Sequence, residues 1–341
     1  MEEISEKTRL LGILKGGEIQ DRPPVICPGG MMNAAVTEVI NDIKGNHNIS
    51  EEDMVLAAKK VKELTGFENY GVPFCMTVES EPFGVKIDFG DKNREPVITN
   101  YNNMTTDEIM NKYCSSDLNS CRVPVVLGAI AKLKNDSIPV IGNITGAIST
   151  ATSIVDPLKL LKMMKKNPDM AYSFIEFINE KLIQYGIDMV KNGADVIAVS
   201  DPTATGEILG KINFEKFAVP MFKKLVDEIH KLDSRIIIHI CGDTSSIIES
   251  LNLIGADAFS FDSIVNIKSV KDKIEAKVMG NVNTQLLQEG PGDRIISVTQ
   301  NCIKSGLDII APACGLSMST TIENLKLMTD SVKGETYNAS N

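Results

Sequence analysis

One imidazole and two thiols follow two apolar runs of this chain. His239 and Cys241 follow the run Ile236-Ile237-Ile238, and Cys314 follows a second run, from Leu307 to Ala311. On a strand, residues i and i+2 share a face, so His239 and Cys241 can point at one ion. If both runs are parallel strands of one barrel, the three side chains converge on one point. Three protein ligands are the number expected of a catalytic zinc with an open fourth position.

The ligand types indicate which metal the site would select. Soft thiolates with one imidazole favour zinc over magnesium or calcium. A buried His beside a buried Cys is the structural alternative for His239 and Cys241. Cys314 favours the metal, because the ends of all strands in a closed barrel face one shared mouth. The other cysteines are scattered, and we expect them to be small buried side chains or inert surface thiols.

The elements that must position these ligands follow a regular rhythm of strands and helices. Apolar runs predict the strands, and amphipathic stretches at 213–232 and 293–305 predict helices between them. These runs begin near Ile138, Ala194, Ile236, Ala256, Ala276 and Leu307. Alternation of this kind is the pattern of βαβ units and a parallel sheet.

The first part of the chain completes the fold prediction. Pro23 to Cys27 predicts a short strand, and residues 51–65 predict a helix with Ser50 as its N-cap. The fold predicted from the whole rhythm is α/β, a single (β/α)8 TIM barrel. We expect one domain over residues 1–341, in which residues 1–70 form an N-terminal helical extension packed on the barrel.

Polar side chains stand at the C-terminal ends of several predicted strands. They are Asn143, Asp201, Asp262, Asn281 and Asn283. Barrel enzymes place their chemistry at this end, so a functional role is one interpretation of the group. Asp and Asn also begin loops and cap helices, and that alternative stays open at each position.

Composition and charge limit the classes of partner. The formal net charge is -10, and no segment concentrates Lys or Arg, so we expect no nucleic-acid partner. No run of about 18 apolar residues is present, so no membrane span is predicted. The charged, acidic start lacks the features of a signal peptide, and we expect a cytoplasmic protein.

Four segments spread along the chain resemble one family. They are Thr8–Gly12 with Asp21–Val25, Cys75–Gly84, Met279–Val282, and Pro312–Gly315 with Thr320–Leu325. With them the chain resembles the uroporphyrinogen decarboxylase superfamily. Within it, the chain is similar to the corrinoid-dependent branch typified by methylcobamide:coenzyme M methyltransferases. The resemblance also implies the barrel, independently of the rhythm of strands and helices.

Two differences from the decarboxylases of this superfamily indicate to which branch the chain is similar. The decarboxylases carry an arginine-rich N-terminal segment that holds the carboxylates of the substrate, whereas Cys27 to Met32 contains no arginine. They also carry a His-bearing motif near the end, where this chain has Cys314. An acidic chain without those arginines is a poor site for a polycarboxylate tetrapyrrole. The methyltransferase branch implies His239, Cys241 and Cys314 as zinc ligands.

The resemblance implies transfer of a methyl group from a methylated corrinoid (methylcobalamin) to coenzyme M or to tetrahydrofolate. The corrinoid would arrive on a separate corrinoid-binding protein, because no Asp-x-His-x-x-Gly sequence is present. Zinc would bind a thiol acceptor as its thiolate. By this resemblance Glu79 or Glu81 takes the released proton or approaches the metal. Asp201 and Asp262 would orient the acceptor or His239 through hydrogen bonds. Asn143, Asn281 and Asn283 are the candidate cofactor-binding side chains.

Alternatives from other classes stay open at this point. A porphyrinogen decarboxylase would not need zinc. A non-catalytic partner of a corrinoid protein would use the zinc as a structural ion, which usually recruits a fourth protein ligand. The acceptor is also open, since no cation for the sulfonate of coenzyme M can be named from the sequence. Nor does the sequence decide between methanogenesis and acetogenesis.

Overall fold

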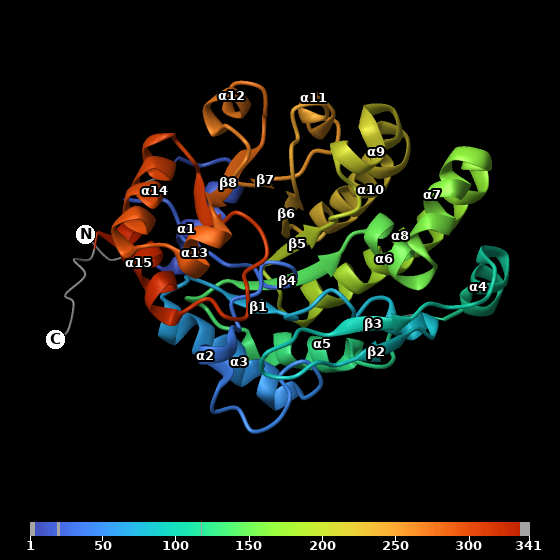
Figure 1. Cartoon of the computed structure of the whole chain (residues 1–341), viewed down its shortest axis with the longest axis horizontal. Coiled ribbons are helices and arrows are strands. Elements are labelled where there is room, and N and C mark those ends of the chain that lie inside the picture. Colours follow the sequence, from blue (N-terminus) through green and yellow to red (C-terminus); the bar gives the residue numbers. More distant parts are fainter. Residues whose placement is uncertain (1–3, 19–20, 117, 335–341) are drawn as a thin grey trace.

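A computed structural model describes residues 4–18, 21–116 and 118–334 of the chain. Its centre is a parallel sheet of seven strands in the order β1-β4-β5-β6-β7-β8-β9. The strands are β1 (Tyr70–Val72), β4 (Val140–Thr145), β5 (Val196–Ser200), β6 (Arg235–Ile240), β7 (Ala258–Phe261), β8 (Lys277–Val282) and β9 (Ile309–Pro312). A short antiparallel pair, β2 (Lys86–Asp88) and β3 (Val97–Asn100), lies to one side (Figure 1).

An N-terminal segment closes the sheet into a barrel. Val25 forms a parallel bridge with Ile310 of β9, and its carbonyl accepts a hydrogen bond from the N–H of Glu68, just before β1. The amide of Asn69 bonds both the N–H and the C=O of Cys27. The predicted strand at 23–27 therefore lies in the barrel wall, between the two edge strands.

The helices surround this sheet (Figure 1). They are α1 (Glu6–Leu14), α2 (Thr37–Ile40), α3 (Glu51–Thr65), α4 (Thr106–Tyr113), α5 (Val123–Leu133), α6 (Ala147–Ile154), α7 (Pro157–Lys166), α8 (Pro168–Asn192), α9 (Gly206–Asn213), α10 (Val219–His230), α11 (Ile248–Leu251), α12 (Ile267–Lys271), α13 (Thr284–Glu289), α14 (Gly292–Lys304) and α15 (Ile322–Lys333). Single turns at Glu81–Phe83 and Phe214–Ala218 complete the helical elements. α8 packs on β4 and β5, α10 on β6, and α14 on β8 and β9.

The prediction of a (β/α)8 barrel with N-terminal helices is confirmed. Each apolar run from Ile138 onward that was predicted as a strand forms one, and Ser50 caps α3 through its side chain. The strand predicted at 23–27 forms only a single bridge, at Val25, because most of its backbone bonds go to side chains and to the loop before β1. The sequence did not predict β1, which has only three residues with Gly71 at its centre. A Cβ at Gly71 would lie 1.8 Å from the carbonyl oxygen of Pro28. Because the two backbones approach closely here, the central residue of β1 must be glycine. The strand therefore lacks a hydrophobic side chain that would have indicated it in the sequence.

Three aspartates fasten the barrel where its strands begin. Asp195, Asp257 and Asp308 directly precede β5, β7 and β9, and each accepts a hydrogen bond from a backbone N–H of a neighbouring strand. Each also pairs with a cation: Lys7 with Asp195, Arg235 with Asp257, and Lys271 with Asp308. Because the carboxylates bind both partners, they tie adjacent strands together at this end.

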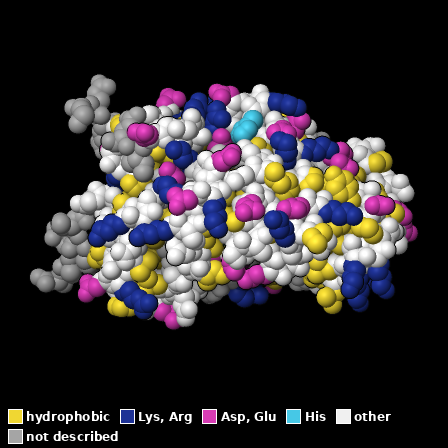
Figure 2. All heavy atoms as spheres, turned by 90° about the horizontal axis from the view of Figure 1, so that it is seen from above, with side chains coloured by type: hydrophobic (Ala, Val, Ile, Leu, Met, Phe, Trp, Pro, Cys, Tyr) yellow, Lys and Arg dark blue, Asp and Glu magenta, His cyan; other side chains and the backbone are white. Residues whose placement is uncertain are grey.

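The surface carries both signs of charge. On the face drawn in Figure 2, Lys and Arg side chains lie interspersed with Asp and Glu side chains, and neither sign forms a continuous field there. Among the residues that the structure describes, no helix combines the length and the apolar character that crossing a membrane requires.

Candidate metal centre

His239, Cys241 and Cys314 converge at the C-terminal end of the barrel, as the sequence predicted. One ligand atom from each lies within 4.8 Å of the others. The Sγ of Cys241 is 3.2 Å from Nε2 of His239 and 3.7 Å from Sγ of Cys314. His239 is buried and the two thiols are half-buried. One nitrogen and two sulfurs at this spacing match the donor set of a zinc site with a free fourth position.

Ser260 holds the ring of His239. Its hydroxyl oxygen lies 3.0 Å from Nδ1, and it occupies the position on β7 that is paired with His239 on β6. With Nδ1 engaged, Nε2 is left to face the thiols, which is how outer hydrogen bonds orient metal-binding histidines. Ser260 was not among the site residues predicted from the sequence. The alternation Ala258-Phe259-Ser260-Phe261, which turns the hydroxyl away from both phenylalanines, could have indicated it.

The two thiols influence each other's ionisation. A hydrogen bond from Cys241, with a further one from His239, lowers the pKa of the Cys314 thiol to about 4. The same bond between the thiols, together with burial, raises the pKa of Cys241. One thiolate is therefore favoured near neutral pH, and the thiolate is the form that binds a metal.

Asp262 secures the backbone that follows Cys241. Its Oδ2 accepts a hydrogen bond from the N–H of Gly242 at 3.3 Å, and its Oδ1 accepts one from the N–H of Ile264. Gly242 has a φ of +71°, a conformation that favours glycine. Asp262 thus fixes the turn that directs the Cys241 side chain. The ring of His239 is held by Ser260 rather than by this carboxylate.

Asp201 is buried beneath the same rim, where it caps α6. Its carboxylate accepts hydrogen bonds from the N–H groups of Ile148 and Ser149 and from the hydroxyl of Ser149. Burial raises the pKa of Asp201 to about 6, against the lowering effect of these bonds. The structure places this residue on the helix N-terminus and not on His239.

The two glutamates of the segment after β1 have different partners. Glu79 is fully buried and accepts hydrogen bonds from the N–H and the hydroxyl of Thr145 at the end of β4. Burial raises the pKa of Glu79 to about 7. Glu81 instead pairs with the guanidinium of Arg122 at 2.8 Å. Neither glutamate belongs to the three-residue cluster of possible metal ligands.

The three asparagines serve the backbone around the mouth. Asn143 donates to the carbonyl of Pro28 at 2.6 Å and to that of Val72. Asn281 donates to the carbonyls of Asp262 and Val265. Asn283 caps α13 through its side-chain oxygen. These contacts shape the loops of the site.

The turn held by Asn143 brings a thioether to the cluster. Gly29 and Met32 exchange backbone hydrogen bonds, which places Gly30 and Met31 at the tip of the turn. The Sδ of Met31 lies 3.6 Å from the Sγ of Cys241. The sulfur of Met32 lies 3.9 Å from the hydroxyl of Ser260. In the sequence this segment stood out only by its lack of arginine, and neither methionine was assigned a role.

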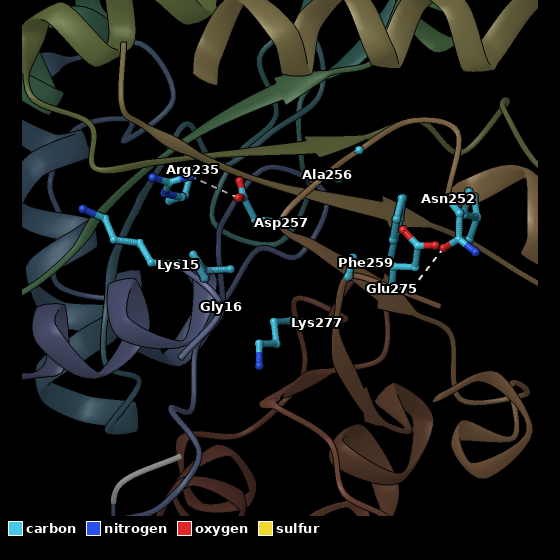
Figure 3. Close-up of a pocket in the computed structure, with 13 residues that line it drawn as sticks. Lys15, Gly16, Arg235, Asn252, Ala256, Asp257, Phe259, Glu275 and Lys277 are labelled. Atoms are coloured by element: carbon cyan, nitrogen blue, oxygen red, sulfur yellow. Dashed lines mark hydrogen bonds and ion pairs between the residues drawn. The ribbon is translucent and has the colours of Figure 1, made fainter. Parts of the chain in front are cut away.

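A cavity lies at the opposite end of the barrel. It measures about 350 Å³ and is lined by residues at the starts of β6, β7 and β8, among them Arg235, Asp257 and Lys277. Figure 3 shows Arg235 directed at Asp257, and Asn252 bonded to Glu275. Barrel enzymes place their chemistry at the C-terminal ends of the strands, so this cavity lies at the wrong end for the metal centre.

Comparisons with known proteins extend these observations to the whole chain. The chain is 30% identical to the methylcobamide:CoM methyltransferase MtbA of Methanosarcina acetivorans, over 99% of this chain and 100% of that protein. It is 27% identical to the methylcobamide:CoM methyltransferase MtaA of Methanosarcina barkeri, over 96% of this chain and 97% of that protein. A solved structure of a methyltransferase from Methanosarcina mazei matches with a TM-score of 0.87 at 28% identity. That match covers 97% of this chain and 99% of the other.

The family model of uroporphyrinogen decarboxylase (URO-D) matches residues 5–335. This range includes all four segments on which the resemblance was based, and it includes the three residues of the metal centre. The chain belongs to the uroporphyrinogen decarboxylase family.

Proposed function

We propose that this protein is a zinc-dependent methyltransferase that moves a methyl group from a methylated corrinoid to the thiol of coenzyme M. The observation that carries the proposal is the convergence of His239, Cys241 and Cys314 at the barrel mouth. Likeness over nearly the full length to methylcobamide:CoM methyltransferases supports it. We also propose that residues 1–341 form one domain, in which the helices of residues 1–70 are an extension packed on the barrel.

The residues present fit zinc. His239 offers Nε2 because Ser260 engages Nδ1, and the thiols supply two sulfurs 3.7 Å apart. Two sulfurs that are each about 2.3 Å from a tetrahedral zinc lie about 3.8 Å apart. Bound by these three residues, zinc would act as a Lewis acid that lowers the pKa of an acceptor thiol and keeps it as a thiolate at neutral pH.

The reaction is a nucleophilic displacement. A carbon–sulfur bond forms to the acceptor, the carbon–cobalt bond breaks, and its electron pair stays on cobalt, which goes from cobalt(III) to cobalt(I). The thiol proton must leave before or during this step. Glu79 is the candidate proton acceptor, since its buried carboxylate has a pKa of about 7. Glu81 is less suited because Arg122 already binds it.

The methyl donor would be delivered by a partner. We propose a separate corrinoid-binding protein that docks over the mouth, because a corrinoid must reach the three ligands from outside the barrel. Asp262, Asn281 and Asn283 would shape this rim through the backbone contacts described above. Asn143 would act through the turn that carries Met31.

The other branch of the family is less compatible with the site. The segment that carries arginines in the decarboxylases here presents a thioether to the cluster, 3.6 Å from Cys241. A thioether does not bind carboxylates, whereas cations do. The site therefore favours a thiol acceptor over a polycarboxylate substrate.

Loss of methylcobalamin tests the proposal directly. Zinc-loaded protein is mixed with methylcobalamin and with coenzyme M or tetrahydrofolate, and the spectrum of the methyl–cobalt bond is followed. We expect this spectrum to be lost with coenzyme M and to persist with tetrahydrofolate. The opposite result would identify tetrahydrofolate as the acceptor and leave the proposed class of reaction unchanged. No loss with either, also when a corrinoid protein carries the methyl group, would contradict the proposed function.

A further inference from the structure

We propose that the thioether of Met31 is a displaceable fourth ligand of the metal centre. It would bind the metal while no acceptor is present, and the acceptor thiolate would replace it. This inference rests on the proposed zinc site and goes beyond it, because it assigns the position that the acceptor must take.

Three possible donor atoms lie close to the Sγ of Cys241. Its Sγ lies 3.2 Å from Nε2 of His239, 3.7 Å from Sγ of Cys314 and 3.6 Å from Sδ of Met31. In a tetrahedral zinc site with sulfur ligands at about 2.3 Å, two sulfurs are separated by about 3.8 Å. The separation between Met31 and Cys241 is therefore the one expected of two ligands on one ion, and it matches the separation between the two cysteines.

The backbone fixes Met31 in this place. Gly29 and Gly30 have φ values of +102° and +58°, and the N–H of Gly30 donates to the carbonyl of Pro73 at 2.7 Å. A Cβ on Gly30 would lie 3.0 Å from the Cβ of Asn143, so the turn packs closely on that side chain. A side chain with φ in this region is strained, which explains glycine at both positions.

The other side of the turn meets the strand end that carries Cys314. A Cβ on Gly315 would lie 3.1 Å from the carbonyl oxygen of Met31 and 3.9 Å from its Cγ. The Met31 side chain thus lies between Cys241 and the residue after Cys314. The thioether is therefore beside one of the two thiols, and its side chain lies next to the loop that carries the other.

A thioether has suitable chemistry for a ligand that must leave. It is soft enough to bind beside thiolates, and it is neutral and weak. An anionic thiolate interacts more strongly than a neutral thioether with a dication, so the acceptor is favoured in the exchange. The two glutamates considered for this position from the sequence are bound elsewhere, Glu79 by Thr145 and Glu81 by Arg122.

Met32 provides a matched control. It is the adjacent residue on the same turn and is likewise a methionine, but its sulfur lies 3.9 Å from the hydroxyl of Ser260. Met31→Leu and Met32→Leu remove the same atom type from neighbouring positions. If Met31 only fills space, zinc will have the same number of sulfur ligands in the two variants.

X-ray absorption at the zinc edge, on protein labelled with selenomethionine, tests the inference. We expect a zinc–selenium contact in the protein without acceptor and in Met32→Leu, and its absence in Met31→Leu. Addition of coenzyme M should remove the selenium contact and add one sulfur. We also expect the apparent Kd for coenzyme M to fall several-fold in Met31→Leu, since no thioether then competes.

The outcomes separate this inference from the proposed function. Zinc bound at one per chain by two sulfurs and no selenium would overturn the role of Met31 and leave the proposed function standing. A selenium contact that persists with coenzyme M bound would overturn the exchange. Failure of the wild-type protein to bind zinc at His239, Cys241 and Cys314 would overturn both.

Discussion

The two ends of the barrel use their ionisable side chains in opposite ways. Where the strands begin, Asp195, Asp257 and Asp308 each bind a strand N–H and a cation. Where the strands end, Glu79 and Asp201 are buried and their pKa values are raised, to about 7 and about 6. The carboxylates at the first end each have a backbone N–H and a cation as partners, whereas burial at the second end disfavours the charged form of Glu79 and Asp201.

This difference indicates which end is built for stability and which for chemistry. Raised pKa values and converging thiols cost folding free energy and are typical of functional sites. Carboxylates with two partners each are typical of structural contacts, and in barrel enzymes this end contributes stability. The cavity of Figure 3 lies where the strands begin, which is the end that contributes stability, so its size alone does not indicate a substrate site.

The largest expected effect is loss of a ligand at the mouth. Cys241→Ser and Cys314→Ser should each lower turnover by more than the roughly 100-fold that loss of an outer hydrogen-bond partner causes. The free energy of unfolding should change little, because the half-buried thiols contribute little packing. Metal analysis, turnover and urea denaturation measure the three quantities. Variants that fail to fold would indicate a structural ion.

The second prediction concerns pH and Glu79. Because its pKa is raised from 4.5 to about 7, the folded protein keeps a proton that the unfolded chain releases. Its contribution to stability is full below about pH 4.5 and is lost as the pH rises through 7. Glu79→Gln stays neutral at every pH. The free energy of unfolding of Glu79→Gln minus that of wild type should therefore be about 3 kcal/mol larger at pH 8 than at pH 4.5.

Urea denaturation between pH 4.5 and pH 8 measures this difference. Glu63→Gln, an exposed change on α3, is the control and should follow the wild-type curve. A constant difference between Glu79→Gln and wild type at all pH values would show that Glu79 is charged in the folded protein.

The third prediction concerns the end of the barrel where the strands begin, where removal of a carboxylate should lower the free energy of unfolding. Asp257→Ala removes the acceptor for the N–H of Ile236 and the partner of Arg235, and should lower the free energy of unfolding by about 1–3 kcal/mol. The exposed change Asp136→Ala should stay within about 0.5 kcal/mol. Bound zinc should be unchanged in both. Loss of zinc in Asp257→Ala would show that the two ends are coupled.

The last prediction concerns the support of His239. Ser260→Ala removes the partner of Nδ1 and should weaken zinc binding by about 10-fold to 100-fold, with the fold retained. Ser245→Ala, an exposed change after the cluster, is the control and should bind zinc as wild type does. Competition with a chelator measures both affinities. Equal affinity in Ser260→Ala would show that packing alone orients the ring.

The sequence predicted the barrel and the convergence of the ligands because both follow from periodic patterns. Strand alternation placed His239 and Cys241 on one face, and strand ends share one mouth. The sequence could not assign hydrogen-bond partners. Asp201 was equally consistent with a residue that orients the acceptor or His239 and with a helix cap, and only the fold places α6 against it. Met31 was not assigned a role because its position depends on contacts with Asn143 and Gly315, distant in sequence.

Removal of the metal tests the central claim, that the mouth holds a catalytic rather than a structural zinc. The protein is stripped with a chelator, and turnover of methylcobalamin with coenzyme M and urea denaturation are measured before and after one equivalent of zinc is restored. We predict that turnover is lost and returns with zinc, while the apoprotein stays folded. An apoprotein that retains turnover, or that unfolds on loss of zinc, would contradict the account.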